Sequence, residues 1–131
     1  RLTQKSDKSS MPTSFEFDEL SDGQRMLIAL YTLLHCTEDE QATLCIDEPA
    51  NFVALPEIQP WLMGVSDAVE KKQCQAFLVS HQPELIDYLA ADCGTVFRRQ
   101  DIGPIQVRPV ARDASDGLKL SEALARGWMN E

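Results

Sequence analysis

A stretch of seven residues, TLCIDEP at positions 43–49, decides the fold of this chain. Four uncharged residues run directly into two adjacent carboxylates, and Pro49 then ends the extended segment. A run this short and this continuously apolar favours a buried parallel strand over Thr43–Ile46. The pattern returns at Ala76–Ser80, where His81 follows. Two buried strands with a helical stretch between them predict a layered α/β fold.

Helices and short strands are expected to alternate along the rest of the chain. The apolar spacing and the prolines predict helices at Ser21–His35, Pro56–Lys72, Pro83–Ala91 and 121–128. Strands are predicted at Thr95–Arg98 and Ile105–Val110, joined by a Gly-Pro turn into a C-terminal hairpin. The alternation in Phe15–Leu20 predicts a short edge strand or an extended approach to the first helix. Residues 1–14 are expected to be a flexible lead-in, which leaves 15–131 as the domain.

The composition is that of one acidic globular domain. With 131 residues, 44% of them hydrophobic, the chain can bury a core but is too short for two comfortable domains. A net charge of −9 argues against a main nucleic-acid-binding surface here, and Arg98-Arg99 is too small a basic cluster for one. The four cysteines form no C-x-x-C pair, so reduced thiols are expected. Without a secretory signal or a membrane-length apolar stretch, the chain is predicted to be cytoplasmic, with no membrane partner.

The tetrapeptide Ser21-Asp22-Gly23-Gln24 opens the first predicted helix and has two compatible interpretations. Ser at the N-cap with Gln three residues later is a capping box, which explains it as an ordinary helix start. The same helix end exposes backbone N–H groups and a positive dipole end to an anion, because Ser and Gly are small. Ser21, Gly23 and Gln24 are therefore candidate phosphate-binding residues.

Asp47 and Glu48 come at the carboxyl end of the first predicted strand, the edge where α/β proteins bind ligands. Asp47 suits Mg²⁺, which takes few carboxylates and keeps much of its water. Glu48 suits the orientation or deprotonation of an attacking water. His81 falls at the same edge if the two strands are neighbours, and it could then donate a hydrogen bond to a phosphate. The alternatives are two solvated acids and a structural or exposed histidine.

Three motifs, taken with their order and spacing, resemble those of a known family. LSDGQ at 20–24 resembles the signature of ATP-binding cassette ATPases, DEPAN at 47–51 resembles Walker B, and SHQPELID at 80–87 resembles the switch-histidine segment. Over residues 15–110 the chain resembles the C-terminal half of a soluble AAA-type head. The closest branch is related to overcoming-lysogenization-defect and structural-maintenance-of-chromosomes proteins. The resemblance implies a partial P-loop NTPase lobe with parallel strands, flanking helices and a C-terminal hairpin.

The resemblance also implies a mechanism that uses ATP and Mg²⁺. In such ATPases two heads pair head to tail, with ATP between the Walker A loop of one head and the signature of the other. Ser21 and Gly23 would then touch the γ-phosphate of ATP held by the partner head. Asp47 would support Mg²⁺, Glu48 would polarise the water, and His81 would sense the γ-phosphate of its own head.

Departures from the family pattern change what is expected of this chain. No G-x-x-x-x-G-K-[ST] loop and no Q-loop glutamine are present, so the N-terminal lobe is expected to lie elsewhere and the fragment alone to be inactive. Asn51 and the residues after it would form a loop that crosses the interface between heads. Ala54-Leu55-Pro56 replaces the usual L-H-P there, and ordinary loop packing is the alternative.

Three hypotheses remain open from the sequence. The leading one is the C-terminal lobe of a larger ATPase that forms a homodimer of heads, in DNA maintenance or phage defence. Any contact with DNA would then come through absent regions. The second is a non-catalytic dimerisation or regulatory module that keeps the ATPase fold. In the third, a separate polypeptide supplies the front half. An upstream coding sequence with a glycine-rich Lys-Ser/Thr loop would favour the first.

Overall fold

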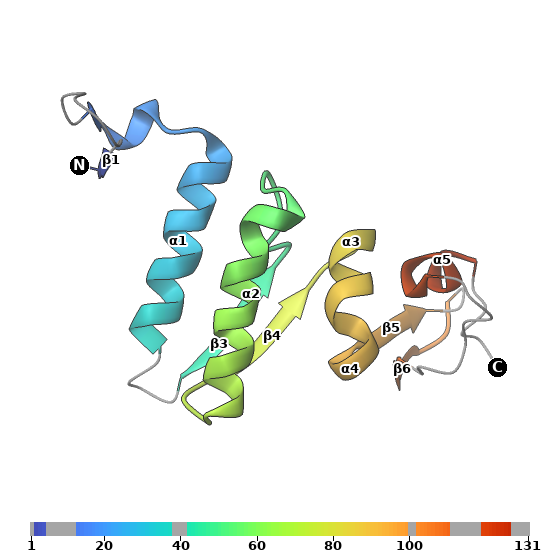
Figure 1. Ribbon diagram of the computed structural model, residues 1–131. Coiled ribbons are helices and arrows are strands. Elements are labelled where there is room, and N and C mark those ends of the chain that lie inside the picture. Colours follow the sequence, from blue (N-terminus) through green and yellow to red (C-terminus); the bar gives the residue numbers. More distant parts are fainter. Residues whose placement is uncertain (1, 5–12, 38–41, 100–101, 111–118, 127–131) are drawn as a thin grey trace. The chain divides into compact units, whose positions relative to one another are not determined.

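The computed structural model describes residues 2–4, 13–37, 42–99, 102–110 and 119–126 (Figure 1). The chain divides into two compact units, residues 1–78 and 79–131. No helix in these described ranges is both long and apolar enough to cross a membrane.

The first unit contains helices and strands in alternation. In chain order they are β1 (Leu2–Gln4), β2 (Thr13–Phe15), the 3-10 helix η1 (Phe17–Glu19), α1 (Asp22–Thr37), β3 (Thr43–Asp47), α2 (Leu55–Glu70) and β4 (Gln75–Val79), whose last residue belongs to the second unit. β1 and β2 pair antiparallel, a pairing that the sequence did not predict. The expectation of an edge strand or extended segment over Phe15–Leu20 was wrong at Phe17–Glu19, whereas Glu16 and Leu20 have extended backbone. Only Phe15 is in a strand, because the chain then turns into η1, where the Glu19 amide donates to the Glu16 carbonyl.

Helices α1 and α2 pack against each other and form the core of this unit. Both helices bury apolar side chains, among them Leu30 and Leu34 on α1, and Ile58, Trp61, Leu62 and Val65 on α2. The fully buried Trp61 indole Nε1 donates a 2.8 Å hydrogen bond to the Leu30 carbonyl. Burying an indole is favourable when its N–H finds an acceptor, so this bond fixes how the two helices pack.

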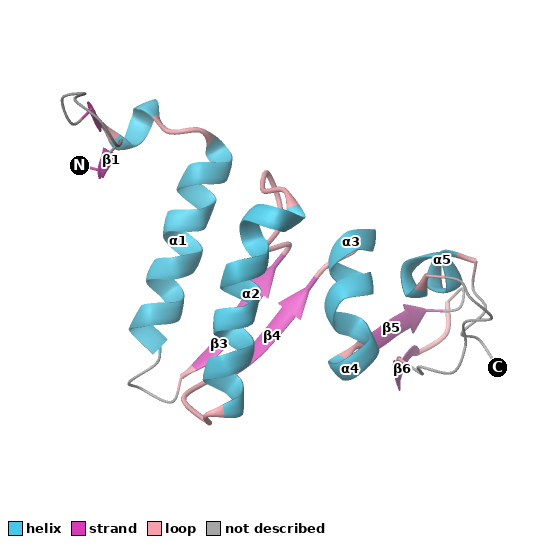
Figure 2. Cartoon of the chain, in the orientation of Figure 1, coloured by secondary structure: helices cyan, strands magenta, loops and turns pink. Residues whose placement is uncertain are grey.

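β3 and β4 form a two-stranded parallel sheet, and their arrows point the same way in Figure 2. Burial alternates along β3: Leu44 is buried, whereas Cys45 is exposed. On β4, Phe77 is 54% exposed. The prediction of fully buried strands was therefore wrong for one face of the sheet. Only one face packs on the core, and the apolar side chains of the other remain uncovered within the described residues.

The end of α2 has a defined cap. The Gln73 amide donates to the Ala68 carbonyl and the Lys72 amide to the Val69 carbonyl, which is the Schellman pattern. Lys72 occupies the position that favours glycine, with φ of 58°. The Schellman pattern at the helix end accounts for the left-handed conformation of Lys72.

The second unit combines one helical segment, a hairpin and a short helix. The helical segment runs through α3 (Pro83–Leu85), the π-helical η2 (Ile86–Ala90) and α4 (Ala91–Cys93). β5 (Thr95–Arg99) and β6 (Ile105–Pro109) pair antiparallel, with Phe97 opposite Val107. α5 covers Leu120–Ala125. The helix predicted at 121–128 thus ends earlier, and positions 127–128 lie outside the described residues.

Asp87, the last residue of the SHQPELID segment, fastens α5 within this unit. Its carboxylate accepts hydrogen bonds from the Ser121 amide (2.8 Å) and hydroxyl (2.9 Å). A carboxylate at a helix start is favourable because the first amides have no acceptor within the helix. The α/β class, the parallel strand pair with helices around it and the C-terminal hairpin are confirmed.

Candidate functional site

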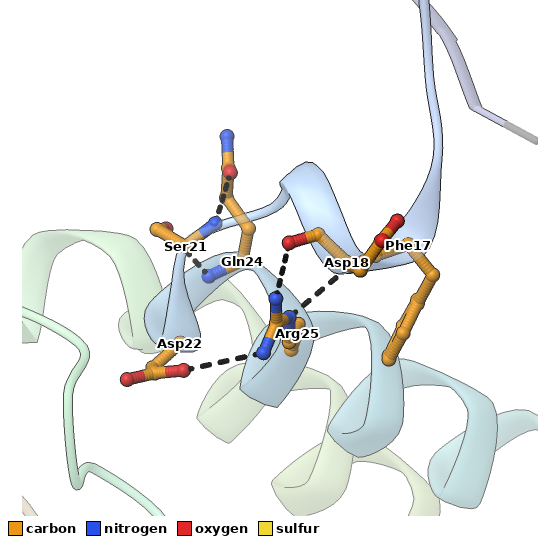
Figure 3. Close-up of polar contacts among 6 residues, drawn as sticks. All are labelled: Phe17, Asp18, Ser21, Asp22, Gln24 and Arg25. Atoms are coloured by element: carbon orange, nitrogen blue, oxygen red, sulfur yellow. Dashed lines mark hydrogen bonds and ion pairs between the residues drawn. The ribbon is translucent and has the colours of Figure 1, made fainter.

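The start of α1 is a capping box, as the sequence predicts. The Ser21 hydroxyl accepts a 3.3 Å hydrogen bond from the Gln24 amide, and the Gln24 side-chain oxygen accepts a 3.0 Å bond from the Ser21 amide (Figure 3). The Ser21 carbonyl accepts the first helical bond, from the Arg25 amide at 3.0 Å. The amides of Asp22 and Gly23 stand at the first two helical positions, which have no acceptor within a helix. These two amides are the donors that an anion would meet.

Gly23 lies directly against the loop that follows β3. A Cβ atom added at Gly23 would stand 2.5 Å from the Phe52 carbonyl oxygen, a distance that real Cβ atoms do not reach. It would also come within 3.9 Å of a Val53 methyl group. Glycine is therefore needed for close backbone approach at this position. The glycine of the signature-like motif and the loop after the acid pair contact each other within one unit.

The loop after β3 has an unusual backbone. Glu48 and Phe52 both have positive φ, 50° and 67°. Between them two turns close the loop, with the Asn51 amide donating to the Glu48 carbonyl and the Val53 amide to the Ala50 carbonyl. A left-handed residue other than glycine costs about 1–2 kcal/mol. Such strain persists only where the surroundings impose it, and it is frequent at functional sites.

Asp47 and Glu48 differ in exposure. Asp47 ends β3 and is exposed, whereas Glu48 is half-buried beside the buried Pro49 and Ala50. Among the described residues no group of three His, Cys, Asp or Glu side chains could hold a metal. An exposed single carboxylate fits Mg²⁺, because this ion is held mainly by substrate phosphates and water. The four cysteines are free thiols, and Cys74 is the buried one.

His81 follows the end of β4 by two residues and belongs to the second unit. Its side chain is exposed, and the turn before α3 is closed by the Gln82 amide, which donates to the Ser80 hydroxyl at 3.1 Å. The carboxyl ends of β3 and β4 share one edge of the sheet because the strands are parallel neighbours. The proximity of His81 to the acid pair stays a prediction, since the residues belong to different units.

The first unit thus contains a parallel strand followed by an acid pair. A capped helix that carries Gly23 packs on the loop after that strand. Residues 7–87 match a family of AAA domains whose description names the AbiEii toxin and a type IV toxin–antitoxin system. The match covers more than half of the chain. This chain belongs to that AAA domain family. No curated protein and no solved structure shows significant similarity to it.

AAA domains bind nucleotide, and the first-unit candidates of this AAA domain lie on two connected segments. Ser21 and Gln24 are hydrogen-bonded to each other, and Gly23 contacts the loop that begins at Glu48. Asp47 directly precedes that loop. The structure thus connects the signature-like and Walker B-like motifs through backbone packing.

Sequence reasoning missed Arg25 in this AAA domain. Its guanidinium bonds two carbonyl groups of η1 and lies near Asp22 (Figure 3). The sequence offered one signal, an arginine immediately after the LSDGQ motif. Nothing in the spacing could show which carbonyl groups this side chain would reach.

Proposed function

We propose that this chain is the signature, Walker B and switch-histidine half of an ATPase head that hydrolyses ATP between two heads paired head to tail. The observation that carries the proposal is the contact of Gly23 with the Phe52 carbonyl. It connects a helix start suited to a phosphate with the loop that follows the acid pair. Membership of an AAA domain family supports nucleotide as the ligand.

Each candidate residue then has a chemical role. The Ser21 hydroxyl and the Asp22 and Gly23 amides would donate to the γ-phosphate held by the partner head, where the dipole of α1 also favours negative charge. The Gln24 side chain keeps the Ser21 amide satisfied, so it acts by holding the cap.

The residues at the sheet edge would act on nucleotide bound in their own head. Asp47 would hold Mg²⁺, whose charge offsets that of the phosphates. Glu48 would accept a proton from, or orient, the attacking water. His81 would donate a hydrogen bond to the γ-phosphate. Most of the rate enhancement in phosphoryl transfer comes from such positioning and charge stabilisation.

The uncovered face of the β3–β4 sheet supports a missing front lobe with the Walker A loop. Parallel sheets are covered on both faces in almost every α/β protein. Here the exposed face presents Cys45, Phe77 and Val79, and Val79 is 61% exposed. We place the missing lobe against this face, either as another part of a longer chain or as a second polypeptide.

The biological process that we propose is phage defence, with DNA maintenance as the related alternative. The toxin–antitoxin wording of the family description and the resemblance to overcoming-lysogenization-defect proteins support defence. The chain's net charge of −9 argues against a main DNA-binding surface within it, so any DNA contact would come through other regions.

The substitution Glu48→Gln in the full-length protein tests the ATPase proposal. Removing the general base while keeping the shape should lower the turnover number by about 100-fold or more. ATP should still bind, so paired heads should accumulate with trapped nucleotide. Steady-state hydrolysis and size-exclusion chromatography with Mg²⁺ and ATP measure both effects.

The control is Glu57→Gln, which changes an acid in the first turn of α2. It should leave turnover unchanged. Unchanged hydrolysis in Glu48→Gln would reject the assignment. A full-length protein that pairs but never hydrolyses ATP would instead favour the non-catalytic dimerisation module.

A further inference from the structure

The guanidinium of Arg25 makes several contacts with the segment that precedes the signature. Its Nε donates to the Phe17 carbonyl at 3.1 Å, and one terminal nitrogen donates to the Asp18 carbonyl at 2.6 Å. It lies 5.7 Å from the centre of the Phe17 ring. The other terminal nitrogen is 3.6 Å from an Asp22 carboxylate oxygen. One side chain thus joins η1 to the first turn of α1 (Figure 3).

Arginine suits this set of contacts better than lysine. Its planar fork holds donors in fixed directions and can stack on an aromatic ring, whereas a lysine ammonium is a point charge on a flexible stem. Arg25 lies one turn after Ser21 and is not part of the capping box, so its side chain can bond the η1 segment without disturbing the cap. The Ser21 hydroxyl and the first amides of α1 therefore lie between η1, which Arg25 bonds, and the first turn of α1, which the cap holds.

Arg25 also faces the one acidic side chain of the motif. Asp22 is exposed, and a negative charge at this helix end opposes phosphate binding. The guanidinium at 3.6 Å offsets part of that charge, although the pair is exposed to solvent and therefore weak. The hydrogen bonds to the carbonyls are consequently the larger contribution of Arg25.

We propose that Arg25 is a positioning residue that fixes the start of α1 for the γ-phosphate of the partner head. It acts through the η1 carbonyls and the Ser21 cap, and does not touch the nucleotide. This inference rests on the proposed function, in which the signature acts on the nucleotide of the partner head.

The test compares three variants: Arg25→Gln, Arg25→Lys, and the double variant that combines Arg25→Gln with Asp22→Asn. Each is made in the full-length protein that also carries Glu48→Gln, which prevents turnover. Two quantities are measured: binding of a fluorescent ATP analogue to unpaired heads, and the ATP concentration that half-saturates pairing. Both single variants should raise that concentration about tenfold or more, because they disturb the two charge-assisted hydrogen bonds to the Phe17 and Asp18 carbonyls. Analogue binding to unpaired heads should not change. The double variant should not restore pairing, because the carbonyl contacts stay broken.

Arg126→Gln is the matched control, since Arg126 is another arginine beside a carboxylate on its own helix, that of Glu122 at 2.6 Å. It should pair as the parent does. Normal pairing in Arg25→Lys, or rescue by Asp22→Asn, would overturn the positioning role in favour of charge alone. A fall in both analogue binding and pairing would show a merely structural role and would overturn the proposal too. If the Glu48→Gln parent itself does not pair with ATP, the proposed function fails and not this inference alone.

Discussion

The start of α1 and the loop after β3 contact each other, yet they differ in backbone conformation. Side chains fasten the start of α1: Ser21 and Gln24 cap each other, and Arg25 bonds the carbonyls before them. The loop after β3 is held by backbone turns and includes two left-handed residues, Glu48 and Phe52. The first region is stabilised locally, whereas the second keeps a costly conformation that the fold around it must impose.

A substitution at the contact between the two regions should have the largest effect on stability. Gly23→Ala should destabilise the protein by about 2 kcal/mol, because the new methyl group meets the Phe52 carbonyl and the backbone must shift. The gain in helix propensity from glycine to alanine offsets only part of that cost. Urea unfolding followed by circular dichroism measures the change. A fully stable Gly23→Ala variant would mean that the two regions do not pack as described.

Loss of the cap should have a smaller effect, confined to the start of α1. Ser21→Ala removes the acceptor of the Gln24 amide and should cost about 1 kcal/mol. Ser21→Asp is the control, since aspartate is an equally good N-cap. It should preserve stability in the same unfolding measurement. Equal losses in both variants would show that something other than the cap is being removed.

Relieving the strained loop should have the smallest effect, and in the opposite direction. Phe52→Gly should raise stability by about 0.5 kcal/mol, because glycine adopts positive φ without steric cost but loses more entropy on folding. The phenyl ring is 74% exposed, so little packing is lost.

Two controls separate the effect of backbone strain on stability from the effect of losing the phenyl ring. Lys72→Gly relieves the same conformation at the end of α2, away from the candidate site, and should give a similar gain. Phe52→Ala keeps the strain and should give none. A gain in Phe52→Ala equal to that in Phe52→Gly would remove the backbone explanation.

The same contrast explains what the sequence could predict. Ser21-Gln24 and the end of β3 follow from local rules on capping and on apolar runs, so these elements were placed correctly. The left-handed Phe52 and the Gly23 contact depend on packing between segments that are distant along the chain. Residue preferences point away from positive φ at phenylalanine, so no local rule could find it.

The errors at Cys45 and η1 have related physical causes. Cys45 lies in a continuously apolar run, which predicts burial on both faces, but only one face of this sheet is packed within the described residues. The turn at η1 is held in part by Arg25, six residues beyond it, so the alternating pattern before the helix was misleading. Asp47, Glu48 and His81 were selected for their chemistry, and their joint geometry around a nucleotide stays a prediction.

The glycine-to-carbonyl contact has a mechanical consequence if two heads pair as proposed. The Glu48 carboxylate, which would act on one nucleotide, and the helix that would touch the other are then joined through the contact between Phe52 and Gly23. A small shift of Glu48 when its phosphate leaves would push the helix beyond Gly23, and the second nucleotide would sense the event without any contact between the two ligands.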